Sequence, residues 1–210
     1  MTTPRRTHLV ERLIGYAGFF RLFRYRLQFT RHDGHLSRVV EREVFERHDA
    51  VMVIPYDPVR QEVLLVEQFR AGAFANPARA ADPWLLEFPA GMIEPGQTAR
   101  DAARREVQEE TGLNVADGDG TLRQLYCYFT SPGGCSERIT LFIAHLDLAG
   151  YDPLPHRGNA HEDEDIKVHV VPVGDLMQLV DAGRIADAST LLGVVWLHKS
   201  LAVAAASVMQ

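Results

Sequence analysis

The stretch GMIEPGQTARDAARREVQEETGL, residues 91–113, constrains the fold of this chain more than any other part of its sequence. Thr98 and Asp101 have the spacing of a capping box, which satisfies backbone donors at the start of a helix. The next residues are rich in alanine, arginine and glutamate, and Gly112 is a typical residue for the end of a helix. The stretch therefore predicts a loop that leads into a helix between Thr98 and Gly112.

The predicted helix carries three glutamates, Glu106, Glu109 and Glu110. With about 3.6 residues per turn, Glu106 and Glu110 point in nearly the same direction, with Glu109 to one side. One interpretation is a solvated acidic face, since like charges at this spacing cost only about 0.2–0.5 kcal/mol each on an exposed helix. The other is a site for Mg²⁺ or Mn²⁺, which prefer carboxylate oxygens and keep positions open for water and phosphate. Helix energetics alone does not decide between them.

The residues around the glutamates favour metal binding. The stretch resembles the Nudix box, in which a glycine, a glutamate and the run Arg-Glu-apolar-x-Glu-Glu-x-Gly-apolar stand at fixed spacing. The positions that fall in register are Gly91, Arg105, Glu106, Val107, Glu109, Glu110, Gly112 and Leu113. The resemblance implies the Nudix fold and hydrolysis of a nucleoside diphosphate linked to another group.

The resemblance also implies roles for single residues of the box. Glu106 and Glu110 are implied as the principal metal ligands, and the backbone carbonyl of Ala90 as a further ligand. Arg105 is placed to pair with Glu109 four residues later and to orient the cluster. Glu109 is implied either to support Arg105 in this way or to hold an outer metal ion.

One position departs from the box, because Gln97 stands where the family usually has a glutamate. If the family's glutamate mainly orients Arg105 or the loop, the amide of Gln97 can replace it by hydrogen bonding, and the change costs little. If that glutamate contributes to a metal site, the loss of its charge lowers metal affinity. We expect a modest effect.

Other segments resemble one branch of the family, the bacterial ADP-ribose pyrophosphatases, over about residues 14–198. They are VEREVFERHDAV, DPVRQEVLLVEQFR, WLLEFPAGMIEPG, SPGGCSER and EDEDIKVHVV. This resemblance implies hydrolysis of ADP-ribose to AMP and ribose 5-phosphate, with Mg²⁺ as cofactor and Mn²⁺ as a substitute. It also implies a homodimer in which the N-terminal sheet packs on the partner or is exchanged with it.

Five residues outside the box correspond to substrate-binding positions of that branch. Arg42, Glu43 and Arg47 match contacts to the adenosine end, although an alternating, solvated strand would look the same. Arg70 matches a residue that meets the phosphates, where a planar guanidinium suits two parallel hydrogen bonds, although a strand-end charge is the simpler interpretation. Glu137 matches an acidic residue near the metal cluster.

The segment HEDED, residues 161–165, contains four consecutive acids and would ordinarily be a solvated loop tip. In the resembling branch, the loop before the next strand supplies the catalytic base. The aligned candidates are Glu162 first and Glu164 second. A carboxylate there could take a proton from the attacking water and complete the site when substrate is bound.

The order of strand and helix patterns predicts an α+β fold, a mixed-sheet α/β/α sandwich with an N-terminal antiparallel β extension. Two alternating runs joined at Asp33-Gly34 predict a hairpin within residues 1–48. So small a sheet cannot cover both its faces, so it should pack on the main domain or on a second subunit. Residues 49–210 are expected to form the Nudix domain, closed by an apolar, buried helix from about residue 188 to residue 208.

Composition narrows the partners and the compartment. The formal net charge is -6, and no block of lysine and arginine supplies a basic stripe that could track the phosphates of nucleic acid. Nucleic acid is therefore not expected as a partner. Two cysteines without metal-ligand spacing indicate free thiols and a cytoplasmic location. The N-terminus lacks a signal-peptide pattern, and the C-terminal apolar stretch is interrupted by His198 and Lys199, so no membrane association is expected.

Two rival functions stay open at this point. The nearer one is the same chemistry on another nucleoside diphosphate sugar, such as GDP-mannose. The other is a non-catalytic sensor of ADP-ribose or a nucleotide sugar, which usually lacks box carboxylates. The intact glutamates favour an enzyme.

Overall fold

The computed structural model describes residues 5–78, 81–116, 118, 120–153, 157–158 and 164–208. The chain divides into two compact units. The first contains residues 1–49 together with residues 129–138, and the second contains residues 50–128 and 139–210. Residues 129–138 join the first unit because the backbone of Phe45 exchanges hydrogen bonds with Gly134 and Ser136, at 2.8 and 3.1 Å.

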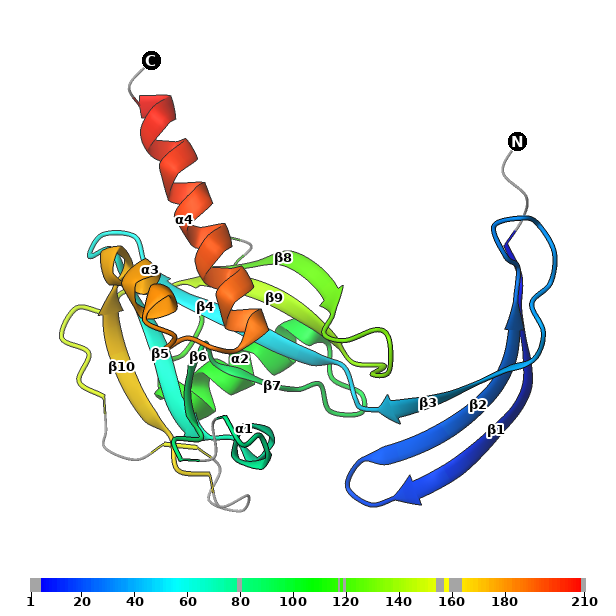
Figure 1. The fold of residues 1–210 in the computed structure, drawn as a ribbon. Coiled ribbons are helices and arrows are strands. Elements are labelled where there is room, and N and C mark those ends of the chain that lie inside the picture. Colours follow the sequence, from blue (N-terminus) through cyan, green and yellow to red (C-terminus); the bar gives the residue numbers. More distant parts are fainter. Residues whose placement is uncertain are drawn as a thin grey trace. The chain divides into compact units, whose positions relative to one another are not determined.

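The first unit is a three-stranded antiparallel sheet in the order β1-β2-β3 (Figure 1). Its strands are β1 (Thr7–Ala17), β2 (Arg21–Phe29) and β3 (Val40–Glu46). The turn between β2 and β3 contains Gly34 at φ 85°, a conformation that glycine adopts without strain. The Asp33-Gly34 turn was predicted, whereas β1 was not.

This sheet buries little of its own apolar surface. Among the described residues of the first unit, Phe23 is the one apolar side chain that is buried. Large apolar side chains remain exposed along β1 and around the turns: Leu9, Val10, Leu13, Ile14, Tyr16, Phe19, Phe29, Leu36 and Val39. A sheet of this size with open apolar faces needs another surface to cover it.

The second unit is built on a mixed sheet whose main path runs β10-β5-β4-β9-β8. β4 pairs with β9 in parallel and with β5 and β7 antiparallel, and β6 extends the sheet beside β5. The strands are β4 (Ala50–Asp57), β5 (Glu62–Phe69), β6 (Trp84–Glu87), β7 (Ala90–Met92), β8 (Leu122–Phe129), β9 (Arg138–His145) and β10 (Lys167–Pro172). Every residue of β4 is buried, as expected for a central strand covered on both faces.

Helices cover both faces of this sheet, which confirms the predicted α/β/α sandwich (Figure 1). On one face, Val51 and Val53 of β4 pack against α2 (Ala99–Thr111). On the other, Met52 and Ile54 pack with residues of α3 (Val173–Asp181) and α4 (Ala188–Val208). A short helix, α1 (Ala71–Ala75), follows β5. Successive residues of one strand thus serve opposite cores, since side chains alternate across a sheet.

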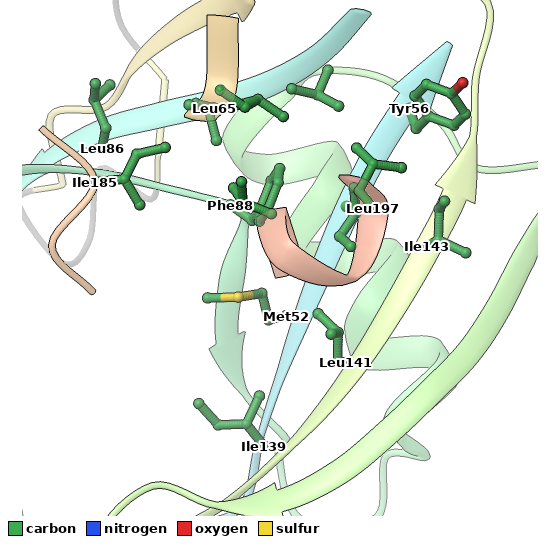
Figure 2. Close-up of a cluster of buried hydrophobic side chains, with 14 of the residues drawn as sticks. Met52, Tyr56, Leu65, Leu86, Phe88, Ile139, Leu141, Ile143, Ile185 and Leu197 are labelled. Atoms are coloured by element: carbon green, nitrogen blue, oxygen red, sulfur yellow. The ribbon is translucent and has the colours of Figure 1, made fainter. Parts of the chain in front are cut away.

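The core under α4 contains the largest cluster of buried side chains, with Phe88 and Leu197 at its centre (Figure 2). The first half of α4 contributes Val194 and Leu197 to it, but residues 202–206 are exposed. The prediction of a buried helix is therefore right for the first half of α4 only, since the second half continues beyond the sheet (Figure 1). By length and composition alone, residues 188–206 would suffice to cross a bilayer, although a core helix passes the same criterion.

Candidate active site

Helix α2 begins and ends where the sequence predicts. The Thr98 hydroxyl accepts a hydrogen bond from the Asp101 backbone N–H, 3.2 Å away, and donates one to the Asp101 carboxylate at 2.6 Å. At the other end, Gly112 adopts the left-handed conformation at φ 78°. One face of the helix, with Ala102 and Val107, packs on the sheet. The packing fixes the direction in which the glutamates of the same helix project.

Glu106 and Glu110 are buried, with exposed fractions of 7% and 3%. Burial, which disfavours the charged form, raises the pKa of Glu106 to about 7, and the charge of Glu109 adds to the rise. Burial and the neighbouring Glu106 raise the pKa of Glu110 well above its ordinary value. A solvated acidic face would show neither effect. Two buried carboxylates one turn apart are instead a donor set that a divalent cation would stabilise.

Arg105 is the cation that is paired with Glu106. Its Nη2 lies 2.8 Å from Glu106 Oε1 and donates to the carbonyl of Met92 at 2.9 Å. Its Nη1 donates to Glu109 Oε2 at 2.9 Å, the pair expected from their spacing of four residues. Arg105 thus ties two carboxylates of α2 to the strand β7, and so orients the cluster.

The segment around β7 lies directly against the glutamates. The backbone N–H of Ala90 donates to Glu110 Oε2 at 3.2 Å, which places this residue beside the proposed metal ligand. A Cβ atom on Gly91 would lie 1.9 Å from Glu106 Oε1, closer than any real contact. The glycine of the box is therefore required so that the Glu106 side chain can lie over the strand.

Gln97 makes its contacts within the loop before α2. Its side-chain oxygen accepts a hydrogen bond from the backbone N–H of Glu94 at 3.3 Å, and the backbone N–H of Gln97 donates to the Glu94 carbonyl at 3.0 Å. These contacts match the alternative in which this position orients the loop. An amide can make them as well as a carboxylate can.

Arg70 follows β5 and forms an ion pair with Glu87 that was not predicted from the sequence. Its Nε and Nη2 both donate to Glu87 Oε2, at 2.8 and 2.5 Å, and Glu87 is only 5% exposed. Burial lowers the pKa of the Arg70 guanidinium, but the charges of Glu87 and Glu110 raise it overall, so Arg70 lies within electrostatic reach of the metal-binding helix. The one signal for Glu87 was an acid in the otherwise apolar run WLLEF.

Glu164 is also brought to the glutamates of α2. Its charge contributes to raising the pKa of both Glu106 and Glu110. The chain approaches it closely at Gly158, where φ is 104° and a Cβ atom would lie 2.7 Å from Glu164 Cβ. Glu162, the first candidate for the base, lies outside the described residues.

The remaining predicted residues lie in the first unit. Arg47 Nη2 is 3.2 Å from Glu137 Oε1, and the Arg47 guanidinium also stands over the ring of Phe20. Glu137 is buried, with its carboxylate 3.3 Å from the Thr130 hydroxyl. Arg42 and Glu43 are exposed neighbours on β3, so they project from opposite faces of the sheet. Arg47 and Glu137 thus form an ion pair, whereas Arg42 and Glu43 lie on opposite faces of the sheet.

The residues of α2 fit a divalent metal ion by their chemistry, since they are buried, hard oxygen donors with incomplete compensation. Within the part of the chain that the structure describes, no three His, Cys, Asp or Glu side chains are grouped as a ready-made metal site. Arg105 holds Glu106 and Glu109 in ion pairs.

Comparison with known families gives a match to the NUDIX domain over residues 46–191. An ADP-ribose pyrophosphatase of Escherichia coli (strain K12) is 40% identical over 190 residues, covering 90% of this chain and 87% of that protein. An ADP-ribose pyrophosphatase of Haemophilus influenzae is 40% identical over 187 residues, covering 89% and 83%.

More distant relatives have a different substrate in their names. A GDP-mannose pyrophosphatase of Pectobacterium atrosepticum is 31% identical over 184 residues, covering 88% of this chain and 90% of that protein. Among solved structures, an ADP compounds hydrolase superposes with a TM-score of 0.67 at 20% identity, over 93% of this chain and 94% of that one. That superposition supports the fold alone.

Proposed function

The chain belongs to the NUDIX domain family, and on this premise we propose that it hydrolyses the pyrophosphate bond of ADP-ribose to give AMP and ribose 5-phosphate. The observation that carries the reaction class is the pair of buried glutamates on α2, Glu106 and Glu110, within the matched domain. The preference for ADP-ribose rests on 40% identity to ADP-ribose pyrophosphatases against 31% to GDP-mannose pyrophosphatases.

The proposed cofactor is Mg²⁺, with Mn²⁺ able to replace it. Glu106 and Glu110 would hold the ion together with the carbonyl of Ala90, and Glu109 would support Arg105 or an outer ion. When bound, the cation neutralises the diphosphate and polarises its phosphorus for attack by water. Arg105 holds the carboxylates in place by its contacts to Glu106 and Glu109.

Two further steps belong to residues near this helix. Arg70, oriented by Glu87, is proposed to bind a phosphate oxygen through the guanidinium edge turned away from that carboxylate. The base that takes a proton from the attacking water is proposed to be Glu162 first and Glu164 second. The electrostatic effect of Glu164 on Glu106 supports an acidic residue of this segment in that role.

The first unit is proposed to bind the adenosine end and to form a homodimer. The residues assigned to adenosine are Arg42, Glu43 and Arg47, and Glu137 is proposed as a further substrate-binding residue. The open apolar surface of the first unit supports a second copy as its cover. Since Arg42 and Glu43 project from opposite faces of β3, one of them would serve a site in the partner.

Small molecules rather than nucleic acid or membranes are the proposed partners, in agreement with the net charge of -6. The proposed location is the cytoplasm, which agrees with Cys127 and Cys135 being free thiols. A nucleoside diphosphate sugar such as GDP-mannose is the alternative substrate, supported by the 31% identical relatives. A non-catalytic sensor is less well supported, because the box glutamates are intact.

A substrate panel tests the proposal. The purified chain is incubated with ADP-ribose, GDP-mannose and other nucleoside diphosphate sugars in Mg²⁺ or Mn²⁺, and the products are identified. We expect AMP and ribose 5-phosphate from ADP-ribose, with a higher kcat/KM than for any sugar nucleotide. A preference for GDP-mannose would establish the alternative, and no turnover with either metal would indicate a sensor.

A further inference from the structure

We propose that Arg157 is a positioning residue, which docks on the last turn of α2 and thereby holds Glu164 beside the metal-binding glutamates. The inference rests on the proposed function, since it concerns how that reaction's acidic segment is placed. It adds a contact that the sequence did not suggest, between the end of the metal-binding helix and the segment that precedes β10.

The first observation is the close approach of Arg157 to Gly112. A Cβ atom on Gly112 would lie 2.2 Å from Arg157 Nη2 and 2.4 Å from its Cζ. The guanidinium therefore lies directly on the residue that ends α2. The last carbonyls of a helix carry partial negative charge, so a cation is favourable at this position. Gly112 is required twice, for its left-handed φ of 78° and for this contact.

The second observation is that the same end of α2 is held from another side. The Tyr151 hydroxyl donates to the carbonyl of Thr111 at 2.7 Å. Burial raises the pKa of Tyr151, and the charge of Arg157 opposes that rise, so the two side chains are neighbours. Arg157 Nε is buried without a hydrogen-bond partner in the described part of the chain. Packing on the helix end, and not hydrogen bonding through Nε, therefore holds this part of the guanidinium group.

The third observation links Arg157 to Glu164. Arg157 and Ile166 exchange two backbone hydrogen bonds, each 2.9 Å long, as an isolated antiparallel bridge. Gly158 then packs against Glu164 so closely that a Cβ atom would lie 2.7 Å from Glu164 Cβ. The backbone that carries the docked guanidinium is therefore in direct contact with Glu164.

Together these contacts form a continuous connection from the end of α2, the helix that carries Glu106 and Glu110, to Glu164. Without the guanidinium, the backbone bridge between Arg157 and Ile166 is no longer anchored to the end of α2. The Glu164 carboxylate would then be held less accurately relative to the metal-binding residues. A displacement of about 1 Å in an active site can cost about 100-fold in rate.

The experiment compares Arg157→Ala and Arg157→Lys with the full-length wild type, using ADP-ribose and Mg²⁺. We expect Arg157→Ala to lower kcat by about 10- to 100-fold. KM and the affinity for Mn²⁺ without substrate should stay within about threefold, since the ligands of α2 are untouched. Lysine keeps the charge without the planar group, so Arg157→Lys should recover part of kcat. Arg184→Ala, at an exposed arginine of the same unit, is the matched control.

A double-mutant cycle with Glu164→Gln separates positioning from general stability. If Arg157 acts through Glu164, Arg157→Ala should cause no further loss of kcat in the Glu164→Gln protein. Additive losses, equal losses of kcat and metal affinity, or unchanged kcat in Arg157→Ala or Glu164→Gln would overturn the proposal. If the alanine variant does not fold, the same cycle is measured with Arg157→Lys. Failure of the wild type to hydrolyse ADP-ribose would instead refute the proposed function.

Discussion

The residues proposed to bind metal, on α2 of the second unit, and two of those proposed to bind adenosine, on β3 of the first unit, lie in opposite environments. In the second unit, Glu106 and Glu110 of α2 are buried, and Arg105 forms an ion pair with Glu106. In the first unit, Arg42 and Glu43 are exposed on a thin sheet whose apolar side chains are also exposed. Buried charges that cost free energy to desolvate indicate a site that one chain builds for itself. A sheet whose own unit leaves its apolar side chains exposed supports the proposed dimer surface.

The contrast predicts that a buried carboxylate of α2 matters far more than an exposed carboxylate of β3. Glu106→Gln should lower kcat/KM for ADP-ribose by about 1000-fold, since it removes a ligand of the cation that stabilises the transition state. Glu41→Gln, at an exposed acid of β3, should change it less than about twofold. Steady-state kinetics at saturating Mg²⁺ measures kcat/KM for both variants. Similar losses in Glu106→Gln and Glu41→Gln would contradict the contrast.

Glu106→Gln should also make the metal-free protein more stable. The pKa of Glu106 is about 7 when folded, against an ordinary value of 4.5, so the folded state binds this proton more tightly. Its contribution to stability is complete below pH 4.5 and is lost as the pH rises through about 7. At pH 8, Glu106→Gln should therefore raise the free energy of unfolding by up to about 3 kcal/mol.

Denaturant unfolding in a metal chelator at pH 4 and at pH 8 measures this difference. The variant and the wild type should have similar stability at pH 4, where the carboxyl is protonated in both states. A variant that is less stable than the wild type at pH 8 would show that Glu106 is not strained by its burial.

The first unit should respond instead to changes of its apolar surface. Ile14→Lys places a charge on an exposed apolar residue of β1, and an unpaired ammonium is costly to bury in an interface. We expect the two subunits to bind each other at least about tenfold more weakly, with a parallel loss of kcat/KM. Sedimentation across protein concentrations tests it, with Val59→Lys in the second unit as the control. A wild type that is monomeric while active would contradict the contrast.

The smallest effect is expected at Gln97. Gln97→Glu restores the residue that the Nudix box usually has, but the contacts of this side chain are with the backbone of Glu94. Both kcat/KM and Mg²⁺ affinity should change by less than about threefold. A larger gain in Mg²⁺ affinity would show that the charge at this position reaches the metal site.

Local patterns in the sequence were sufficient for α2. The cap at Thr98, the end at Gly112 and the Arg105–Glu109 pair follow from neighbours along one helix, and all are present in the structure. Gly91 was recognised by resemblance, and its reason became visible only when Glu106 was seen to lie over it.

Contacts between distant segments were not predictable in the same way. The Arg70–Glu87 pair depends on the pairing of β5 with β6, and the docking of Arg157 on Gly112 depends on how the chain returns to α2. Strand β1 was missed because only its pairing with β2 distinguishes it from an exposed, irregular segment. Tertiary pairing decides such positions, and a single sequence does not display it.

Binding of Mn²⁺ to the substrate-free protein tests the central claim most directly, that the buried glutamates of α2 are metal ligands. Titrations at pH 8 would compare the wild type with Glu110→Gln and with the first-unit control Glu41→Gln. We predict saturable binding to the wild type and the control, and a loss of more than about 10- to 100-fold for Glu110→Gln, the loss typical even of outer-sphere partners. Equal affinity for all three proteins would contradict the assignment of the metal site to α2.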